Sequence, residues 1–247
     1  MRTSDTQGTE KIEMSKGSLL IVVGILLLTE SQASGEVLVG IKGGVGISNF
    51  GLGANIQDRI RIYHDGNFDL NVAPFSRHGF QGGLFSNIPL NSFLSLQPEI
   101  LYSEKGAGGD PYTNDQWKLN YLEAVVLVKC DLAHTGSNSF FIIGGVENDF
   151  KLSSKFTTEN VNTGEEFVYE IGNVKSTDFG TVIGAGVSHQ FNKIVLSLEG
   201  RYVFGMKSLV DTDIIYSDLQ DTFYLANEDE PARNRSLKIL VGLAFRI

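Results

Sequence analysis

The segment from Gly79 to Gly106 reads GFQGGLFSNIPLNSFLSLQPEILYSEKG and decides the fold of this chain. It consists of two runs joined by a tight turn at Asn91-Ser92. In the second run, apolar and polar residues alternate, which predicts a β-strand with one apolar and one polar face. The apolar set is Leu94, Leu96, Pro98, Ile100 and Tyr102; the polar set is Ser95, Gln97, Glu99, Ser103 and Lys105, with Leu101 as the apolar exception on the polar side.

Two strands around a tight turn form an antiparallel hairpin, which is marginally stable in water when isolated. We therefore expect this hairpin to belong to a larger sheet. Six further segments alternate in the same way or carry short apolar runs, and each predicts another strand. They are residues 37–50, 117–132, 139–152, 177–191, 194–204 and 236–247.

The connections between the expected strands alternate in length. Long connections follow the first, third, fifth and seventh strands, and short ones follow the second, fourth and sixth. Outer-membrane barrels have this arrangement, with short periplasmic turns at one end and longer outer loops at the other. We predict an all-β protein whose residues 34–247 form an eight-stranded antiparallel up-and-down transmembrane β-barrel, with both termini on the periplasmic side.

Three motifs resemble the outer-membrane β-barrel domain of the Bacteroidota porin family, the group that includes PorT, and the chain is similar more broadly to small barrels of the OmpA/OmpX type. The motifs are Gly79 to Leu90, Phe93 to Gly106, and the run YLEAVVLVK from Tyr121 to Lys129. The resemblance implies an outer-membrane barrel. It leaves open a PorT-like part in secretion, with envelope or secretion proteins as partners, and it also covers many barrels with no assigned role.

The polar face of the strands is rich in Gly, Ser and Gln and carries few charges, whereas a solvated exterior usually carries more Lys, Glu and Thr. We therefore expect the polar face to line the crowded lumen of a narrow barrel. The charges on that face are then expected to form an internal polar network that plugs the lumen. The predicted network comprises Lys42, Glu99, Glu123, Glu199, Arg201 and Lys238.

Aromatic residues sort toward the two ends of the expected strands, as the interface girdles of a membrane barrel do. Near the short turns lie Phe93, Phe140, Phe191 and Phe245; toward the long loops lie Tyr102, Trp117, Tyr121, Tyr202 and Phe204.

The N-terminal segment reads as a signal peptide. Lys16 precedes an apolar run from Leu19 to Leu28, and Ser31-Gln32-Ala33 predicts cleavage after Ala33. Met14 offers a second start position, because the residues before it are polar. The apolar run is shorter than the roughly 20 residues that a membrane-spanning helix needs. We thus expect residues 1–33 to be a signal peptide for export.

The net charge of −9 disfavours nucleic acid as a partner, and so does the value of −8 that remains when the three basic and four acidic residues of 1–33 are removed. The single cysteine, Cys130, rules out an intrachain disulfide. We expect membrane lipid around a monomer.

Candidates for chemistry are few. The four histidines show no metal-ligand spacing, and the acidic segment 206–233 matches no calcium-loop pattern. His78, close to Ser76 near the expected outer rim, is the one candidate base for hydrolysis. We predict no catalytic, cofactor-binding or metal-binding residues, and no enzyme activity.

The sequence favours an outer-membrane barrel with a structural or interaction role in the cell envelope. Two alternatives stay open from the residues alone. One is a soluble, secreted, lipocalin-like binder of small ligands, whose apolar residues would face inward. The other is an outer-membrane hydrolase that uses His78.

Overall fold

The computed structural model describes residues 36–51, 60–64, 68–72, 75–108, 116–160, 164–170, 174–209, 214–218, 221–224 and 233–247. The predicted signal peptide, residues 1–33, lies outside the described residues. In the described part of the chain, no helix is long and apolar enough to cross a membrane.

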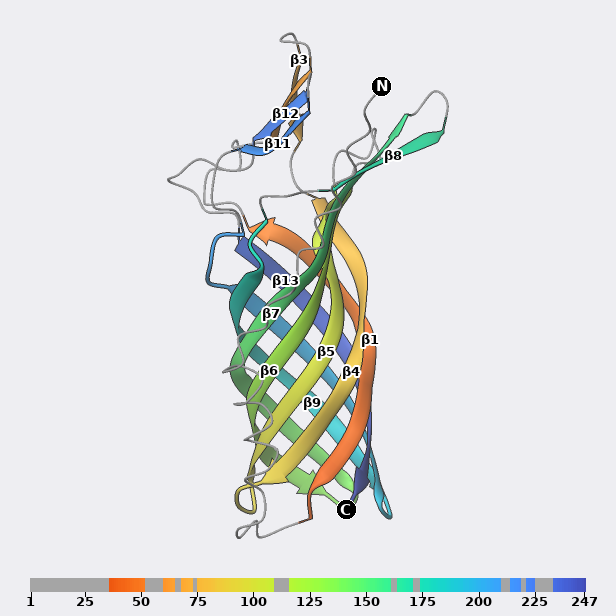
Figure 1. The fold of residues 1–247 in the computed structure, drawn as a ribbon. Coiled ribbons are helices and arrows are strands. Elements are labelled where there is room, and N and C mark those ends of the chain that lie inside the picture. Colours follow the sequence, from red (N-terminus) through yellow and green to blue (C-terminus); the bar gives the residue numbers. More distant parts are fainter. Residues whose placement is uncertain are drawn as a thin grey trace, which may run out of the picture. The chain divides into compact units, whose positions relative to one another are not determined.

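Eight long strands close into an antiparallel barrel (Figure 1). Their order around the barrel is β6-β5-β4-β1-β13-β10-β9-β7, and pairing of β6 with β7 closes it. Seven of the eight neighbouring pairs join long strands that follow each other along the chain, and the eighth pair, β1 with β13, joins the first long strand to the last. The predicted eight-stranded up-and-down barrel is therefore confirmed. The strands are β1 (Leu38–Gly51), β4 (Phe75–Pro89), β5 (Leu94–Gly108), β6 (Gln116–Thr135), β7 (Asn138–Asn160), β9 (Thr177–Phe191), β10 (Ile194–Gly205) and β13 (Arg233–Arg246).

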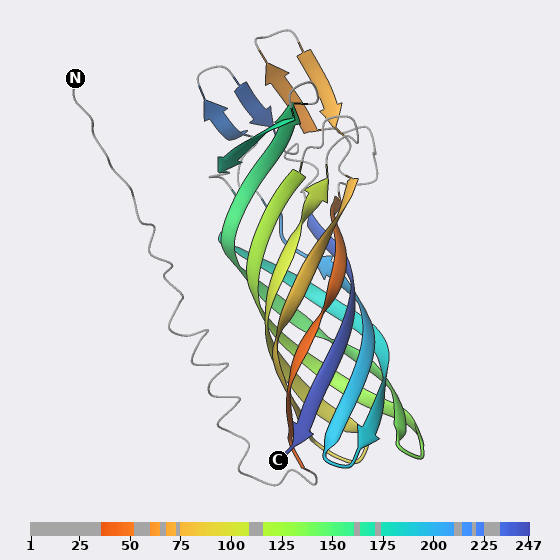
Figure 2. The same ribbon diagram turned by 90° about the vertical axis from the view of Figure 1, so that its right-hand side faces the viewer.

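Three short turns and the C-terminus lie at one end of the barrel, here called the turn end; the opposite end is the loop end (Figures 1 and 2). In the turn between β4 and β5, the Asn91 side-chain oxygen accepts hydrogen bonds from the backbone N–H groups of Phe93 (2.9 Å) and Leu94 (2.8 Å). Gly136 and Asn192 supply the positive φ angles (61° and 55°) in the other two turns. Turns of this kind need residues that tolerate the left-handed region.

The loop end carries additional strands that the sequence analysis did not anticipate. β8 (Glu165–Glu170) pairs with residues 155–160 of β7. β2 (Ile60–His64), β3 (Phe68–Val72), β11 (Ile214–Asp218) and β12 (Asp221–Tyr224) form a separate sheet in the order β11-β12-β2-β3. The long connections after the first and seventh expected strands therefore contain short strands of their own. β12 pairs with β2 and so joins segments about 160 residues apart, a long-range contact that no local pattern reports.

The outer surface of the barrel is apolar. Ile41 (59% exposed), Val45 (60%) and Leu84 (62%) are examples, and all of the long barrel strands expose large apolar side chains of this kind. The interior instead holds Lys, Glu and Arg residues that are almost fully buried. This distribution is the reverse of that in a soluble barrel, so the lipocalin-like alternative is overturned.

Two of the expected girdle aromatics lie inside the barrel instead. Trp117 and Tyr121 are 2% and 0% exposed, and the Trp117 ring packs 5.0 Å from the ring of Phe156. Both residues share the parity of Glu123 on β6, where each face carries apolar residues and hydrophobicity alone cannot assign the direction of a side chain. The turn-end aromatics, by contrast, do point outward: Phe93, Phe140, Phe191 and Phe245 are each at least 50% exposed.

Candidate functional site

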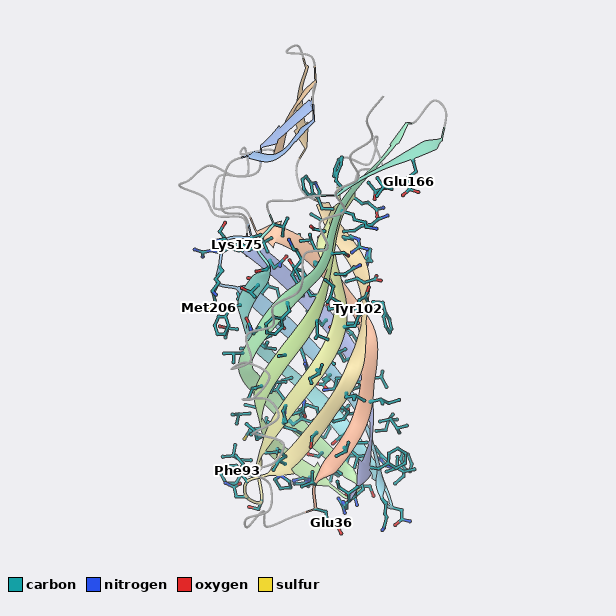
Figure 3. The ribbon with its side chains drawn as sticks, in the orientation of Figure 1. Glu36, Phe93, Tyr102, Glu166, Lys175 and Met206 are labelled. Carbon is teal, nitrogen blue, oxygen red and sulfur yellow. The ribbon has the colours of Figure 1, made fainter. Side chains whose placement is uncertain are left out.

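All six charged residues of the predicted network lie on the inner face of the barrel and are at most 3% exposed. The strand alternation positions them, because each has outward-facing neighbours on both sides along its strand. They come from five strands: Lys42 from β1, Glu99 from β5, Glu123 from β6, Glu199 and Arg201 from β10, and Lys238 from β13. Figure 3 shows the side chains on the ribbon.

Four of them form a first group, the Arg201 cluster, consisting of Lys42, Glu99, Glu199 and Arg201. Arg201 donates from Nη1 to Glu99 Oε2 (2.6 Å) and from Nη2 to Glu99 Oε1 (2.7 Å), a bidentate pair. It also donates from Nε and Nη2 to Glu199 Oε2, at 3.0 and 2.7 Å. Lys42 Nζ donates to Glu99 Oε1 at 2.7 Å and also pairs with Glu199. Two cations thus balance two carboxylates.

Glu123 and Lys238 belong to a second group, the Lys238 cluster, which consists of Lys105, Glu123, Glu147, Asp149 and Lys238. Lys238 Nζ lies 2.8 Å from Glu123 Oε2 and 3.1 Å from Glu147 Oε2. Lys105 Nζ contacts three carboxylates, those of Glu123 (2.9 Å), Glu147 (2.8 Å) and Asp149 (2.5 Å). Every carboxylate in this cluster therefore has at least one ammonium partner.

Lys105, Glu147 and Asp149 were not among the predicted network residues. Lys105 lies on the polar parity of its strand, which was a usable signal. Glu147 and Asp149 lie in the run VENDF, where polar residues occupy both faces, so local pattern does not show which of them point inward. The pairing of β6 with β7, which places Asp149 opposite Glu123, supplies the missing information.

An apolar cluster fills the lumen beside the charged groups. Leu101 and Leu127 are fully buried, and the cluster draws on β5, β6, β7, β9 and β10; its members are Leu101, Val125, Leu127, Phe141, Ile143, Val182 and Val203. Lysine ammonium groups also lie over interior rings, with Lys42 4.5 Å from the Phe85 centroid and Lys129 4.3 Å from that of Phe141. Cations at this range from a ring face are attracted to it.

A small cavity lies toward the turn end, lined by Lys129, Glu199 and Phe141 among others. Its volume is about 20 Å³, which is room for one water molecule. A cavity of this size does not provide a water-filled path through the barrel.

Three carboxylates of the Lys238 cluster have a geometry that could suit a hard cation. Oxygens of Glu123, Glu147 and Asp149 lie within 4.8 Å of one another. The ammonium groups of Lys105 and Lys238, however, already bind these oxygens and neutralise much of their charge. The arrangement is accounted for by lysine, and it does not call for a metal.

The candidate base for hydrolysis lies away from the lumen. His78 and Ser76 are both exposed residues on β4. His78 is opposite Ile47, an outward-facing residue of β1, and within the described residues the His78 and Ser76 side chains make no hydrogen bond to each other. The side chains of the acidic segment 210–232 lie outside the described set.

Comparison with known proteins gives a family and a set of similar structures. Residues 30–211 match a family model described as an outer membrane protein beta-barrel domain. No curated protein sequence matches the chain.

Three of the similar solved structures come from bacteria. Neisserial surface protein A is 11% identical, with 85% of this chain and 97% of that chain covered and a TM-score of 0.43. The outer membrane protein OprG from Pseudomonas aeruginosa is 12% identical, with 86% and 97% covered and a TM-score of 0.45. The attachment invasion locus protein Ail of Yersinia pestis is 12% identical, with 86% and 99% covered and a TM-score of 0.35.

Proposed function

The chain belongs to the family of outer membrane protein beta-barrel domains, and on that premise we propose that it is an envelope protein with a structural or interaction role whose lumen is plugged by its own side chains. The observation that carries this proposal is the pair of charged clusters. Nine charged side chains from β1, β5, β6, β7, β10 and β13 meet in the interior, each within ion-pair distance of a partner.

Physical considerations support a closed lumen. An eight-stranded barrel has an interior about wide enough for side chains alone. Removing one of the interior charges would leave its cluster with an uncompensated buried charge, at a cost of about 3–5 kcal/mol. Thermal opening of a wide path would break several of the interior ion pairs at once.

Planar-bilayer recording tests the plug. Purified wild-type protein, inserted from detergent and checked for insertion by protease protection, is expected to give no stable large conductance. Stable large conductance from the wild-type protein would overturn the proposal. Arg201→Ala is expected to weaken resistance to denaturation without opening a wide pore, because the apolar cluster and the Lys238 cluster still fill the section beside it.

With the lumen closed, we assign the function to the loop end and its partners. The pairing of β12 with β2 joins the segment after β1 to the segment after β10, so two loops form one sheet. The resemblance to PorT-like barrels suggests envelope or secretion proteins as the partners of this surface. A pull-down from detergent with wild-type protein and with a variant lacking residues 60–72 tests this: a partner held by the loop sheet is lost in the variant, and retention of every partner speaks against it.

The remaining features of the proposed function concern processing and assembly. We propose that export removes residues 1–33, that both termini of the mature chain are periplasmic, and that the barrel is a non-enzymatic monomer. N-terminal sequencing of protein from outer membranes tests the cleavage, and protease accessibility of a C-terminal tag in intact cells tests the orientation. Light scattering in detergent tests the monomer, and an unchanged rate of lipid or peptide hydrolysis in His78→Ala tests the absence of catalysis.

A further inference from the structure

Two buried aspartates face each other in the loop-end half of the lumen. Asp149 on β7 is directly opposite Asp178, the second residue of β9. Both side chains are on the inner face and are at most 3% exposed. Like charges directly opposite on neighbouring strands repel each other. The pair is therefore unfavourable unless positive charge lies close to both carboxylates.

The partners that the chain supplies to Asp178 are neutral. Asp178 Oδ2 accepts a hydrogen bond from Asn234 Nδ2 (2.8 Å), and Oδ1 accepts one from the backbone N–H of Phe179 (2.8 Å). Within the residues that the structure describes, Asp178 makes no ion pair. Lys151, two residues on from Asp149, donates from Nζ to the Val174 carbonyl. A carboxylate that is buried without a cation carries a large desolvation cost.

The ammonium group beside Asp149 is shared among several carboxylates. Lys105 Nζ lies 2.5 Å from Asp149 Oδ2 and also pairs with two glutamates of the Lys238 cluster. The Lys238 cluster and Asp178 together contain four carboxylates and two ammonium groups, so this part of the lumen has a net charge of −2 when all of them are ionised. The carboxylates are Glu123, Glu147, Asp149 and Asp178, and the ammonium groups are Lys105 and Lys238.

Oxygen atoms without a partner surround the two aspartates. Asp149 Oδ1, Asn234 Oδ1 and Tyr121 Oη are buried and accept or donate no hydrogen bond among the described residues. The hydrogen bond from Asn234 Nδ2 holds the Asn234 amide beside Asp178. Asp149 and Asp178 are also close enough to the Tyr121 hydroxyl to interact with it electrostatically. Oxygens from β6, β7, β9 and β13 thus converge on one region.

The chemistry of these atoms indicates the class of ligand. Asp149 Oδ1 and Asn234 Oδ1 can only accept, so the group that binds them is a hydrogen-bond donor or a cation. Water would satisfy the acceptors but would leave the net charge of −2 uncompensated. A hard divalent cation satisfies both, and Ca²⁺ takes carboxylate, amide and water oxygens in irregular geometry.

We propose that Asp149, Asp178, Asn234 and Tyr121 form a Ca²⁺-binding site in the loop-end half of the lumen. The two aspartates supply the charge, and Asn234 Oδ1 and Tyr121 Oη supply neutral oxygens. Water molecules complete the roughly six to eight oxygens that Ca²⁺ takes. The site uses the Asp149 oxygen that Lys105 does not bind, and it is distinct from the three carboxylates that the lysines hold together.

Calorimetric titration of the full barrel with CaCl₂ tests the site, after refolding in chelator and exchange into neutral detergent without chelator. The wild-type protein is expected to bind one Ca²⁺ saturably. Asp178→Asn removes one charge from the ligand set and is expected to weaken binding at least about tenfold. Tyr121→Phe removes one neutral oxygen at constant charge and is expected to weaken binding less than Asp178→Asn.

Urea titration with and without Ca²⁺ gives a second readout. Without Ca²⁺, Asp178→Asn is expected to unfold at a higher urea concentration than the wild-type protein, because it removes an uncompensated buried charge. With saturating Ca²⁺ the order is expected to reverse, because the cation stabilises the protein that binds it more tightly. The same order in both conditions would contradict a role of Asp178 in binding Ca²⁺.

Glu166→Gln is the matched control, because it removes one exposed carboxylate (58% exposed) at the loop end and is expected to leave Ca²⁺ binding unchanged. If Asp178→Asn fails to fold by heat-modifiability, Tyr121→Phe serves in both titrations. No saturable binding by the wild-type protein would overturn the proposal and leave water or a proton shared by the aspartates. Equal Ca²⁺ affinity of the wild-type protein and both site variants would place the cation elsewhere and also overturn it.

Discussion

Arg201 on β10 and Glu99 on β5 form a bidentate ion pair in the barrel interior, with N–O distances of 2.6 and 2.7 Å. The two strands are not neighbours in the sheet, so the pair spans the lumen and ties opposite walls together. Because both side chains are at most 3% exposed, removing one of them leaves the other charged and buried.

Glu99→Gln is therefore expected to lower the free energy of unfolding by about 3–5 kcal/mol. Urea unfolding followed by the fluorescence of Trp117, the one tryptophan of the chain, measures the change. Replacing both partners, as in Glu99→Leu/Arg201→Met, is expected to be less destabilising than Glu99→Gln. The double variant leaves Lys42 paired with Glu199 and the cluster neutral, whereas Glu99→Gln leaves two cations with one carboxylate. A double variant that is less stable to urea than Glu99→Gln would contradict this explanation.

Lys105 and Lys238 are predicted to differ in importance. Lys105 is the ammonium partner of Asp149 in the described residues, whereas Glu123 and Glu147 each contact both lysines. Lys105→Met thus leaves Asp149 without a cation and is expected to cost about 3–5 kcal/mol of unfolding free energy. Lys238→Met is expected to cost less, as measured by the same urea titration.

The second substitution Asp149→Asn supplies the control for this prediction. In the Lys105→Met background it removes the unpaired charge and is expected to recover part of the lost stability. If Asp149→Asn lowers the free energy of unfolding in the Lys105→Met background by as much as it does in the wild-type protein, the two residues are not coupled.

The strands were predictable from sequence because lipid outside and a polar interior impose a period of two. Leu196 and Leu198, for example, alternate with Ser197 and Glu199 on β10, and the structure exposes the two leucines. The alternation fails on β6, where Val125 and Leu127 are apolar yet face inward. There the direction follows from Glu123 and Lys129, which share their parity and are themselves buried.

The residues that make up the interior network were harder to predict from the sequence. Glu147 and Asp149 meet Lys105 only because β5, β6 and β7 are adjacent and in a particular register. Ion pairs such as Lys238 with Glu123 join residues 115 positions apart. The local sequence pattern can predict at best whether a side chain points inward or outward. Its ion-pair partners depend on which strands the closed barrel brings together.

The lipid-facing wall yields a third prediction. Leu198 and Ile239 are 49% and 52% exposed on the outer face of β10 and β13. Leu198→Arg is expected to cost about 2–4 kcal/mol, since an arginine at mid-depth faces hydrocarbon. Ile247→Arg, at the turn end where the side chain is 75% exposed, is expected to cost about 0–1 kcal/mol. Folding titrations into lipid vesicles measure both; equal losses at the two positions would mean that Leu198 is not in hydrocarbon.

Alanine is expected to have opposite effects on stability at two adjacent glycines of β1, Gly43 and Gly44. A Cβ on Gly44 would collide with the backbone of Ile239 on β13, because the two strands approach closely on the inner face. A Cβ on Gly43 would meet nothing closer than an ordinary contact of 3.7 Å with the Gln81 carbonyl.

Gly44→Ala is therefore expected to lose about 1–3 kcal/mol of unfolding free energy through overpacking. Gly43→Ala is expected to gain about 0.4–1 kcal/mol, because alanine restricts the unfolded chain. The two variants have the same composition and lie on the same strand, so any general effect of alanine cancels between them. Heat-modifiability on gels and urea midpoints measure the difference; similar stabilities for the two variants would show that close approach of β1 to β13 does not require glycine at position 44.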